Sequence, residues 1–287
     1  MNNIKYGIVS RSFSNMPVLE AAKKMQNLGY ACTELCFTHD DLQGWNYNGY
    51  SDYEALGVDE KLVCDKAQIF RHHGIEITAL GVFSNLVTPD EDLWVKCKQF
   101  YLRSMEFAAA AKIPAIATEC GFRSEYRGLT TEHYESDFTR LKERTAELAR
   151  FAQNLGIKIA IEACVIDVIN SPKRLRDFIL QLQDEYGLDN IGVLLDPANF
   201  IATADEDDMF KYLADHVIYL HGKDRKVNDT YGRMLGDGDI DWPRFFKNYY
   251  MYTPDKPFII EYTTEATAEL TNDRVREFSG QARRAYD

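Results

Sequence analysis

Short apolar runs alternate with longer amphipathic segments along the whole chain. Apolar runs of this kind are typical of buried parallel strands, whereas the amphipathic segments predict helices. The predicted strands cover residues 5–9, 32–37, 75–82, 115–120, 158–164, 191–196, 217–221 and 258–262. The predicted helices cover residues 17–28, 59–73, 90–111, 131–155, 171–186, 205–213, 242–250 and the segment after 262.

Strands that alternate with helices imply a parallel sheet. Eight repeats favour a closed (β/α)8 TIM barrel, an α/β fold, over an open doubly wound sheet. The first strand is not followed by Gly-x-Gly-x-x-Gly, which argues against a dinucleotide-binding fold. Because no linker or change of composition divides the chain, we expect residues 1–287 to form a single domain. Residues 38–57 are too many for a tight turn, so we predict a functional loop there.

Four of the predicted strands end in a side chain that can bind a metal ion. These side chains are Glu162, Asp196, His221 and Glu261. In a barrel the carboxyl ends of the strands meet at one face, so the four side chains should converge. Clustered carboxylates repel one another, and a divalent cation relieves that repulsion. A single strand-end glutamate is as often a cap or a salt-bridge partner, so it is the joint pattern that indicates a metal site. Three carboxylates and an imidazole suit Mn²⁺, Mg²⁺ or Co²⁺, with Zn²⁺ as an alternative.

The overall charge of the chain argues against a nucleic-acid partner. The net charge is −12 and the pI is about 5.0, and the basic residues are scattered along predicted helices. A protein that binds a phosphate backbone usually carries a basic patch. We therefore expect a small neutral or metal-bound molecule as the partner, and no nucleic acid.

The amino terminus and the cysteines bear on location. Residues 1–9 lack a long apolar region behind a basic start, so we expect no signal peptide. No apolar run approaches the roughly 20 residues of a membrane helix. The cysteines at positions 32, 36, 64, 97, 120 and 164 lack paired zinc spacing. We expect buried, reduced thiols in a cytoplasmic protein.

Several short motifs occur in the order typical of one superfamily. They are Leu19-Glu-Ala-Ala, Leu28-Gly-Tyr, Glu34-Leu35, Ile161-Glu162, Asp196-Pro-Ala-Asn199, His221-Gly-Lys-Asp224 and Gly236-Asp-Gly-Asp-Ile-Asp241. Each motif is short, but their order and strand positions extend over nearly the whole chain. With them the chain resembles the xylose-isomerase-like TIM-barrel superfamily, in particular its sugar phosphate isomerase/epimerase branch.

The resemblance implies a metal-dependent reaction. Glu162, Asp196, His221 and Glu261 would bind one divalent cation, with Mn²⁺ as the first expectation. In ketose 3-epimerases of this family the two glutamates also act as acid and base. Carried over, one glutamate removes the proton next to a polarised carbonyl, which gives an enediolate, and the other returns a proton to the opposite face. Return at the neighbouring carbon would give aldose–ketose isomerisation.

The expected substrate-binding residues follow the same resemblance. Many of these epimerases carry a histidine where this chain has Asn199, which can hold a substrate hydroxyl but cannot shuttle a proton. Lys223 would reach the substrate or stabilise the enediolate, or it would pair with Asp224 at the barrel rim. Arg225 is the nearest counterpart of a family arginine, although its spacing is unusual.

Further residues on the same face are candidates from their position alone. Glu34 ends the second strand and either binds hydroxyls or has a structural role. Trp45, with Tyr47 and Phe83, would cover the C–H surface of a sugar, or these residues would simply pack within the loops. His39 lies beyond the second strand and is a further substrate-binding candidate.

Other functions use similar sites. An inosose-type dehydratase or a hydroxypyruvate isomerase would use the same metal and base, and a non-catalytic metal- or sugar-binding barrel is a different class. An apurinic endonuclease needs more histidines on this face than His221 and His39. Two opposed glutamates favour an enzyme, because binding alone does not require two bases. No glycine-rich phosphate cradle is visible, which favours a free sugar, and a homo-oligomer is left open.

Overall fold

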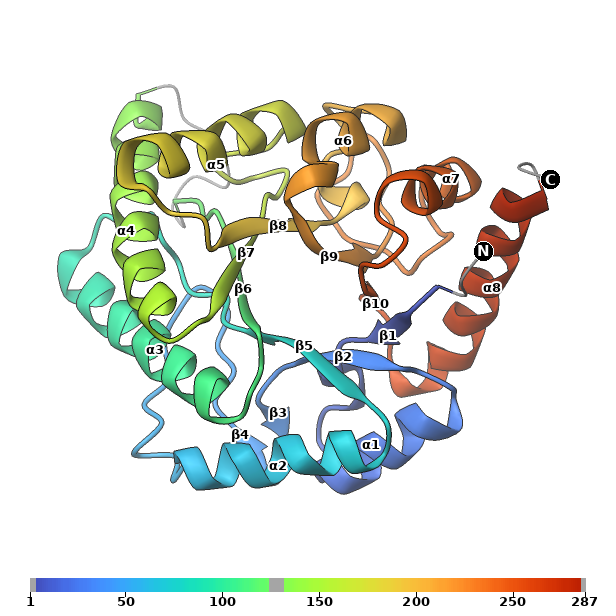
Figure 1. Ribbon diagram of the computed structural model, residues 1–287, viewed down its shortest axis with the longest axis horizontal. Helices are drawn as coiled ribbons and strands as arrows, with labels where there is room; N and C mark the ends of the chain where they lie inside the picture. Colours follow the sequence, from blue (N-terminus) through green and yellow to red (C-terminus); the bar gives the residue numbers. More distant parts are fainter. Residues whose placement is uncertain (1–3, 124–131, 285–287) are drawn as a thin grey trace.

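The computed structural model describes residues 4–123 and 132–284. Within these residues, eight parallel strands close into a barrel with helices around it (Figure 1). Around the barrel the strands follow the order β1-β10-β9-β8-β7-β6-β5-β2. Their bounds are β1 Tyr6–Ile8, β2 Cys32–Leu35, β5 Glu76–Gly81, β6 Ala115–Glu119, β7 Lys158–Glu162, β8 Ile191–Leu195, β9 Val217–Gly222 and β10 Phe258–Ile260. The predicted TIM barrel is confirmed, and each predicted strand corresponds to one of these.

The helices also follow the predicted pattern. Their bounds are α1 Val18–Asn27, α2 Glu60–His72, α3 Glu91–Ala110, α4 Tyr134–Asn154, α5 Pro172–Tyr186, α6 Glu206–Leu213, α7 Trp242–Tyr252 and α8 Ala268–Arg284. Short 3-10 helices are η1 Ser10–Phe13, η2 Pro197–Asn199, η3 Ala214–His216 and η4 Glu265–Thr267. The predicted start of α4 at residue 131 lies outside the described residues. The carboxylates of Asp59, Asp90, Asp205 and Asp241 cap the first turns of α2, α3, α6 and α7, where backbone N–H groups have no helical partner.

A small apolar cluster fills the inside of the barrel. Its residues come from strands all around the barrel, and all four from β5, β6 and β7 are alanines. The residue two positions before each candidate ligand belongs to it; these residues are Ala160, Leu194, Tyr219 and Ile259. Because side chains alternate between the two faces of a strand, the four candidate ligands point into the barrel as well.

The loop predicted at residues 38–57 contains a little regular structure. Strands β3 Thr38–His39 and β4 Leu42–Gln43 form a two-stranded antiparallel sheet outside the barrel. Further along, the Trp45 N–H donates to the Phe37 carbonyl and the Asn48 N–H donates to the Phe83 carbonyl. Since Phe37 and Phe83 follow β2 and β5, these bonds hold the loop against the carboxyl ends of the strands.

Two further expectations concern the state of the cysteines and the length of the apolar segments. All six cysteines lie in the described part of the chain and are free thiols, and Cys64 alone among them is half-exposed rather than buried. No described helix combines the length and apolar character that crossing a membrane requires.

Asp224 organises the long loop between β9 and α7. Its buried carboxylate accepts hydrogen bonds from the backbone N–H groups of Arg225, Gly236 and Ile240 and from the indole N–H of Trp242. A Cβ at Gly238 would lie 2.1 Å from Asp224 Oδ1, so glycine is required for this approach. Asp224 therefore ties the Gly-Asp-Gly turn to the strand that carries His221.

We expect replacement of Asp224 by alanine to destabilise the protein. The change leaves four donors, three of them buried, without their charged acceptor, which should lower the free energy of unfolding by about 3–5 kcal/mol. Urea unfolding followed by circular dichroism measures this loss. The matched control is Asp237→Ala in the same turn, whose side chain is 43% exposed, and which should change stability by less than about 1 kcal/mol. Equal losses in the two variants would contradict the role of Asp224.

Candidate metal centre

The four predicted ligands meet inside the carboxyl end of the barrel. Glu162 ends β7, Asp196 follows β8, His221 lies near the end of β9 and Glu261 follows β10. Each offers one ligand atom, and these atoms all lie within 4.8 Å of one another. All four side chains are buried. Residues nearly a hundred positions apart thus form one compact set of three carboxylates and an imidazole.

His221 is oriented by a carboxylate behind it. Its Nε2 lies 2.9 Å from Oε2 of Glu34, which also accepts a hydrogen bond of 2.6 Å from the Tyr219 hydroxyl. The opposite ring atom, Nδ1, faces Glu261 Oε2 at 3.5 Å and Glu162 Oε1 at 3.8 Å. Burial lowers the pKa of His221, but the Glu34 and Glu162 carboxylates together outweigh burial and raise the pKa to about 9. A carboxylate that fixes the far side of a histidine is the usual arrangement at metal sites.

Glu34 lies behind His221 and is buried. Of the two roles predicted for it, binding of substrate hydroxyls and a structural role, this position favours the structural one. A Cβ at Gly81 would lie only 2.7 Å from Glu34 Oε1, so the glycine at the end of β5 makes room for this carboxylate. The geometry indicates that Glu34 positions His221.

The donor atoms fit a divalent cation. Asp196 Oδ2 and Glu261 Oε2 are buried and face the Lys223 ammonium, whereas His221 Nδ1 is buried without a hydrogen bond. A divalent cation among these atoms would give the imidazole a partner and would compensate the two buried carboxylates. Burial, with the neighbouring Glu162 carboxylate acting in the same direction, raises the pKa of Asp196 to about 6 even with the Lys223 ammonium beside it. Oxygen-rich sets with one imidazole suit Mn²⁺ or Mg²⁺, and Zn²⁺ also accepts them.

Lys223 lies among the same carboxylates. Its Nζ is 2.8 Å from Asp196 Oδ2, 3.1 Å from Glu261 Oε2 and 3.4 Å from Glu162 Oε1. Burial alone would lower the pKa of Lys223, but the Asp196 and Glu162 carboxylates hold it well above its usual value. The alternative of a rim salt bridge with Asp224 is not what the structure shows, because Asp224 is engaged by the loop.

Asn199 and Arg225 form a chain behind Glu162. The Asn199 amide donates to Glu162 Oε1 at 2.7 Å, and its carbonyl oxygen accepts from the Arg225 guanidinium at 3.0 Å. Arg225 also donates to the carbonyls of Ala198 and Thr230. We predicted that Asn199 and Arg225 bind substrate, but both are buried and engaged within the protein. The geometry assigns them to positioning Glu162.

A cavity of about 210 Å³ opens beside the candidate ligands. Its lining consists of Arg11, Trp45, Tyr47, Phe83, Glu119, Glu162, Lys223, Glu261 and Tyr262. Trp45 thus lies beside the candidate ligands, and it stacks with Tyr47 at a centroid distance of 6.3 Å. His39 does not line this cavity; it is buried in the β3–β4 sheet with its ring 6.2 Å from that of Phe70 in α2.

The sequence reasoning missed three residues of the cavity. The Arg11 guanidinium pairs with Glu261 Oε1 and lies 5.6 Å from the Trp45 ring centroid. Glu119 ends β6, and its Oε2 accepts a hydrogen bond of 2.8 Å from the Tyr47 hydroxyl. Tyr262 follows Glu261 and has a left-handed backbone with φ of 53°. The strand-end rule that found the ligands would also have found Glu119.

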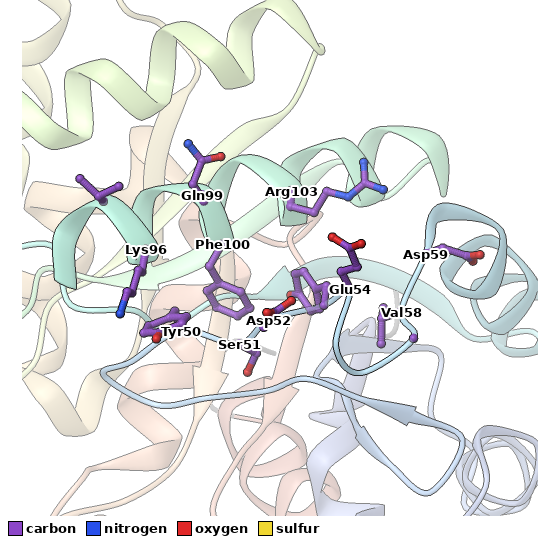
Figure 2. A pocket seen from close by; sticks show the side chains of 13 residues that line it. Tyr50, Ser51, Asp52, Glu54, Val58, Asp59, Lys96, Gln99, Phe100 and Arg103 are labelled. Atoms are coloured by element: carbon purple, nitrogen blue, oxygen red, sulfur yellow. The ribbon is translucent and has the colours of Figure 1, made fainter. Parts of the chain in front are cut away.

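A larger cleft elsewhere lacks this chemistry. It encloses about 800 Å³ between residues 50–59 and α3, and Phe100 is among the side chains that line it (Figure 2). Its charged side chains, among them Asp52, Glu54 and Arg103, are of both signs, and it contains none of the candidate ligands. The smaller cavity is therefore the candidate active site.

Comparison with known proteins places this geometry in a family. The sequence matches the family model of the xylose isomerase-like TIM barrel over residues 22–279. No curated protein matches the chain significantly in sequence.

Three solved structures illustrate the likeness in fold. D-psicose 3-epimerase from Clostridium cellulolyticum H10, determined with D-tagatose, is 15% identical; the match covers 97% of this chain and 99% of that one, with a TM-score of 0.72. 3-Keto-D-glucoside 4-epimerase from E. coli is 13% identical, with coverage of 96% and 100% and a TM-score of 0.72. The IOLI protein with a bound zinc atom is 16% identical, with coverage of 97% and 98% and a TM-score of 0.72. At these identities the likeness supports the fold alone. Because the family model covers most of the sequence, the protein belongs to the xylose isomerase-like TIM-barrel family.

Proposed function

We propose that the protein is a divalent-metal-dependent sugar isomerase or epimerase of the sugar phosphate isomerase/epimerase branch. The observation that carries the proposal is the pair of glutamates, Glu162 and Glu261, which belong to one candidate metal site and line one small cavity. Sugar epimerases with the same fold support it. The chemistry would be proton abstraction next to a carbonyl.

In this proposal four residues bind the cation, and two of them also transfer a proton. Glu162, Asp196, His221 and Glu261 would hold the ion, with Mn²⁺ as our first choice. A bound divalent ion would polarise a substrate carbonyl and so acidify the neighbouring C–H group. One of the two glutamates would then accept the proton, and the other would return one from its own side of the cavity.

The cavity favours a small, uncharged substrate. At about 210 Å³ it is smaller than the roughly 300–1,000 Å³ of sites for drug-sized ligands, and suits a monosaccharide. Trp45, Tyr47 and Phe83 would cover C–H surfaces of the ring. Among the described residues that line the cavity, the cation Arg11 is already paired with Glu261. A free sugar therefore fits better than a phosphorylated one.

We expect Glu162→Gln and Glu261→Gln each to abolish proton exchange. An amide cannot accept a proton, so incorporation of solvent deuterium into a responsive sugar should fall by at least about 100-fold. The measurement is a panel of ketoses, aldoses and inososes incubated in deuterated buffer with Mn²⁺ and followed by NMR. Circular dichroism and metal analysis of each variant separate loss of catalysis from loss of fold or of metal.

The control for this pair is Glu20→Gln, an exposed glutamate on α1, which should exchange at the wild-type rate. Unchanged exchange in both cavity variants would contradict the mechanism. Loss of water from an inosose, without exchange in any sugar, would favour the dehydratase alternative. Tight metal binding without reaction anywhere in the panel would favour a non-catalytic barrel.

Glu119 is a third carboxylate in the cavity, and its protonation should be visible in the stability of the protein. Burial, followed by the neighbouring Glu162, raises the pKa of Glu119 to about 7 from its ordinary value of 4.5. The folded state thus favours the protonated form. The resulting stabilisation is fully present below pH 4.5 and is lost as the pH rises to about 7.

We expect Glu119→Gln to be more stable than the wild type at pH 8 but not at pH 5. The amide stays neutral and can still accept the Tyr47 hydrogen bond, so the gain at pH 8 should be on the order of 1–2 kcal/mol. Urea unfolding at the two pH values, with EDTA present, measures it. Glu20→Gln should show no such difference. A gain that is equal at both pH values would show that Glu119 ionises normally.

A further inference from the structure

The contacts of Lys223 suggest a role that differs from substrate binding. Its side chain is 5% exposed. The ammonium group lies within 3.4 Å of one oxygen each from Asp196, Glu261 and Glu162. Among the described residues, these are the three carboxylates of the candidate metal site.

Lys223 contacts the same oxygen atoms that a metal ion would need. Asp196 Oδ2 and Glu261 Oε2 are buried, and the Lys223 ammonium lies 2.8 Å from the first and 3.1 Å from the second. The other oxygens of these carboxylates are occupied, because Asp196 Oδ1 accepts from the Ala198 N–H and Glu261 Oε1 pairs with Arg11. A divalent cation and the ammonium would therefore share one set of oxygens, and two cations at such short range repel each other.

The cavity beside Tyr262 offers the Lys223 ammonium a second position. It lines the cavity together with Tyr262, and its Nζ lies 5.2 Å from the centroid of the Tyr262 ring. That ring is about half exposed and attracts cations through its face. A change of side-chain rotamers would carry the ammonium from the carboxylates towards Tyr262 and the cavity.

We propose that Lys223 is a built-in competitor of the metal ion: it neutralises the three carboxylates in the metal-free protein and must withdraw when the ion binds. Lys223 thereby weakens metal binding and stabilises the metal-free barrel. The inference rests on the metal site of the proposed function, but it concerns binding and not turnover.

Lys223→Met tests the inference, because it keeps the length of the side chain and removes its charge. Titration calorimetry with Mn²⁺ should show affinity at least about tenfold higher than that of the wild type. In EDTA the variant should melt at a lower temperature than the wild type, and Mn²⁺ should raise its melting temperature by more. Lys223→Gln serves as a second neutral variant if the methionine variant folds poorly.

Lys226→Met is the matched control, since Lys226 is exposed three positions further along the chain. Its Mn²⁺ affinity and its melting temperature in EDTA should equal those of the wild type. Equal or weaker Mn²⁺ binding by both neutral variants at position 223 would overturn the inference and leave the proposed enzyme intact. If neither the wild type nor the variants bind an ion, the metal site itself fails, and with it both proposals.

Discussion

Three buried carboxylates at one end of the barrel are the constraint on which the surrounding structure depends. Glu162, Asp196 and Glu261 offer oxygens within 4.8 Å of one another, and so many negative charges can be buried together only if they are compensated. Lys223 and Arg11 supply positive charge. These side chains come from different strand ends and the segments that follow them. Closure of the barrel therefore brings the three carboxylates and the two cations together.

The convergence of the four candidate ligands was predictable because two simple regularities coincide. Side chains alternate along a strand, and all strands of a parallel barrel run in the same direction. An apolar run that ends in a polar residue therefore specifies both the face and the end of the barrel, as Ala160 and Glu162 show on β7. The same reasoning explains why the barrel was predictable. It also applies to Glu119, which ends β6 and lines the same cavity.

Hydrogen-bond partners could not be predicted in this way. Sequence places Asn199 and Arg225 at the correct end of the barrel, but a side chain there can turn towards the substrate or towards a neighbouring loop. The choice depends on how the loop after β9 is tied down by Asp224, which brings Arg225 against Asn199. His39 is similar, because the short β3–β4 sheet places its ring against Phe70.

Tyr262 shows how the barrel supports a strained residue at the site. A left-handed backbone costs a bulky residue roughly 1–2 kcal/mol, yet Tyr262 adopts a φ of 53°. Immediately before it, the Glu261 N–H donates to the Gly222 carbonyl at the end of β9, which fixes the approach of the chain. The turn then sends Glu261 into the carboxylate cluster and the Tyr262 ring over Lys223. Strain of this size persists where surrounding structure enforces it, and it is concentrated at functional sites. Here the enforcing structure is β10, which pairs with both β9 and β1 and so holds the backbone that leads into Tyr262.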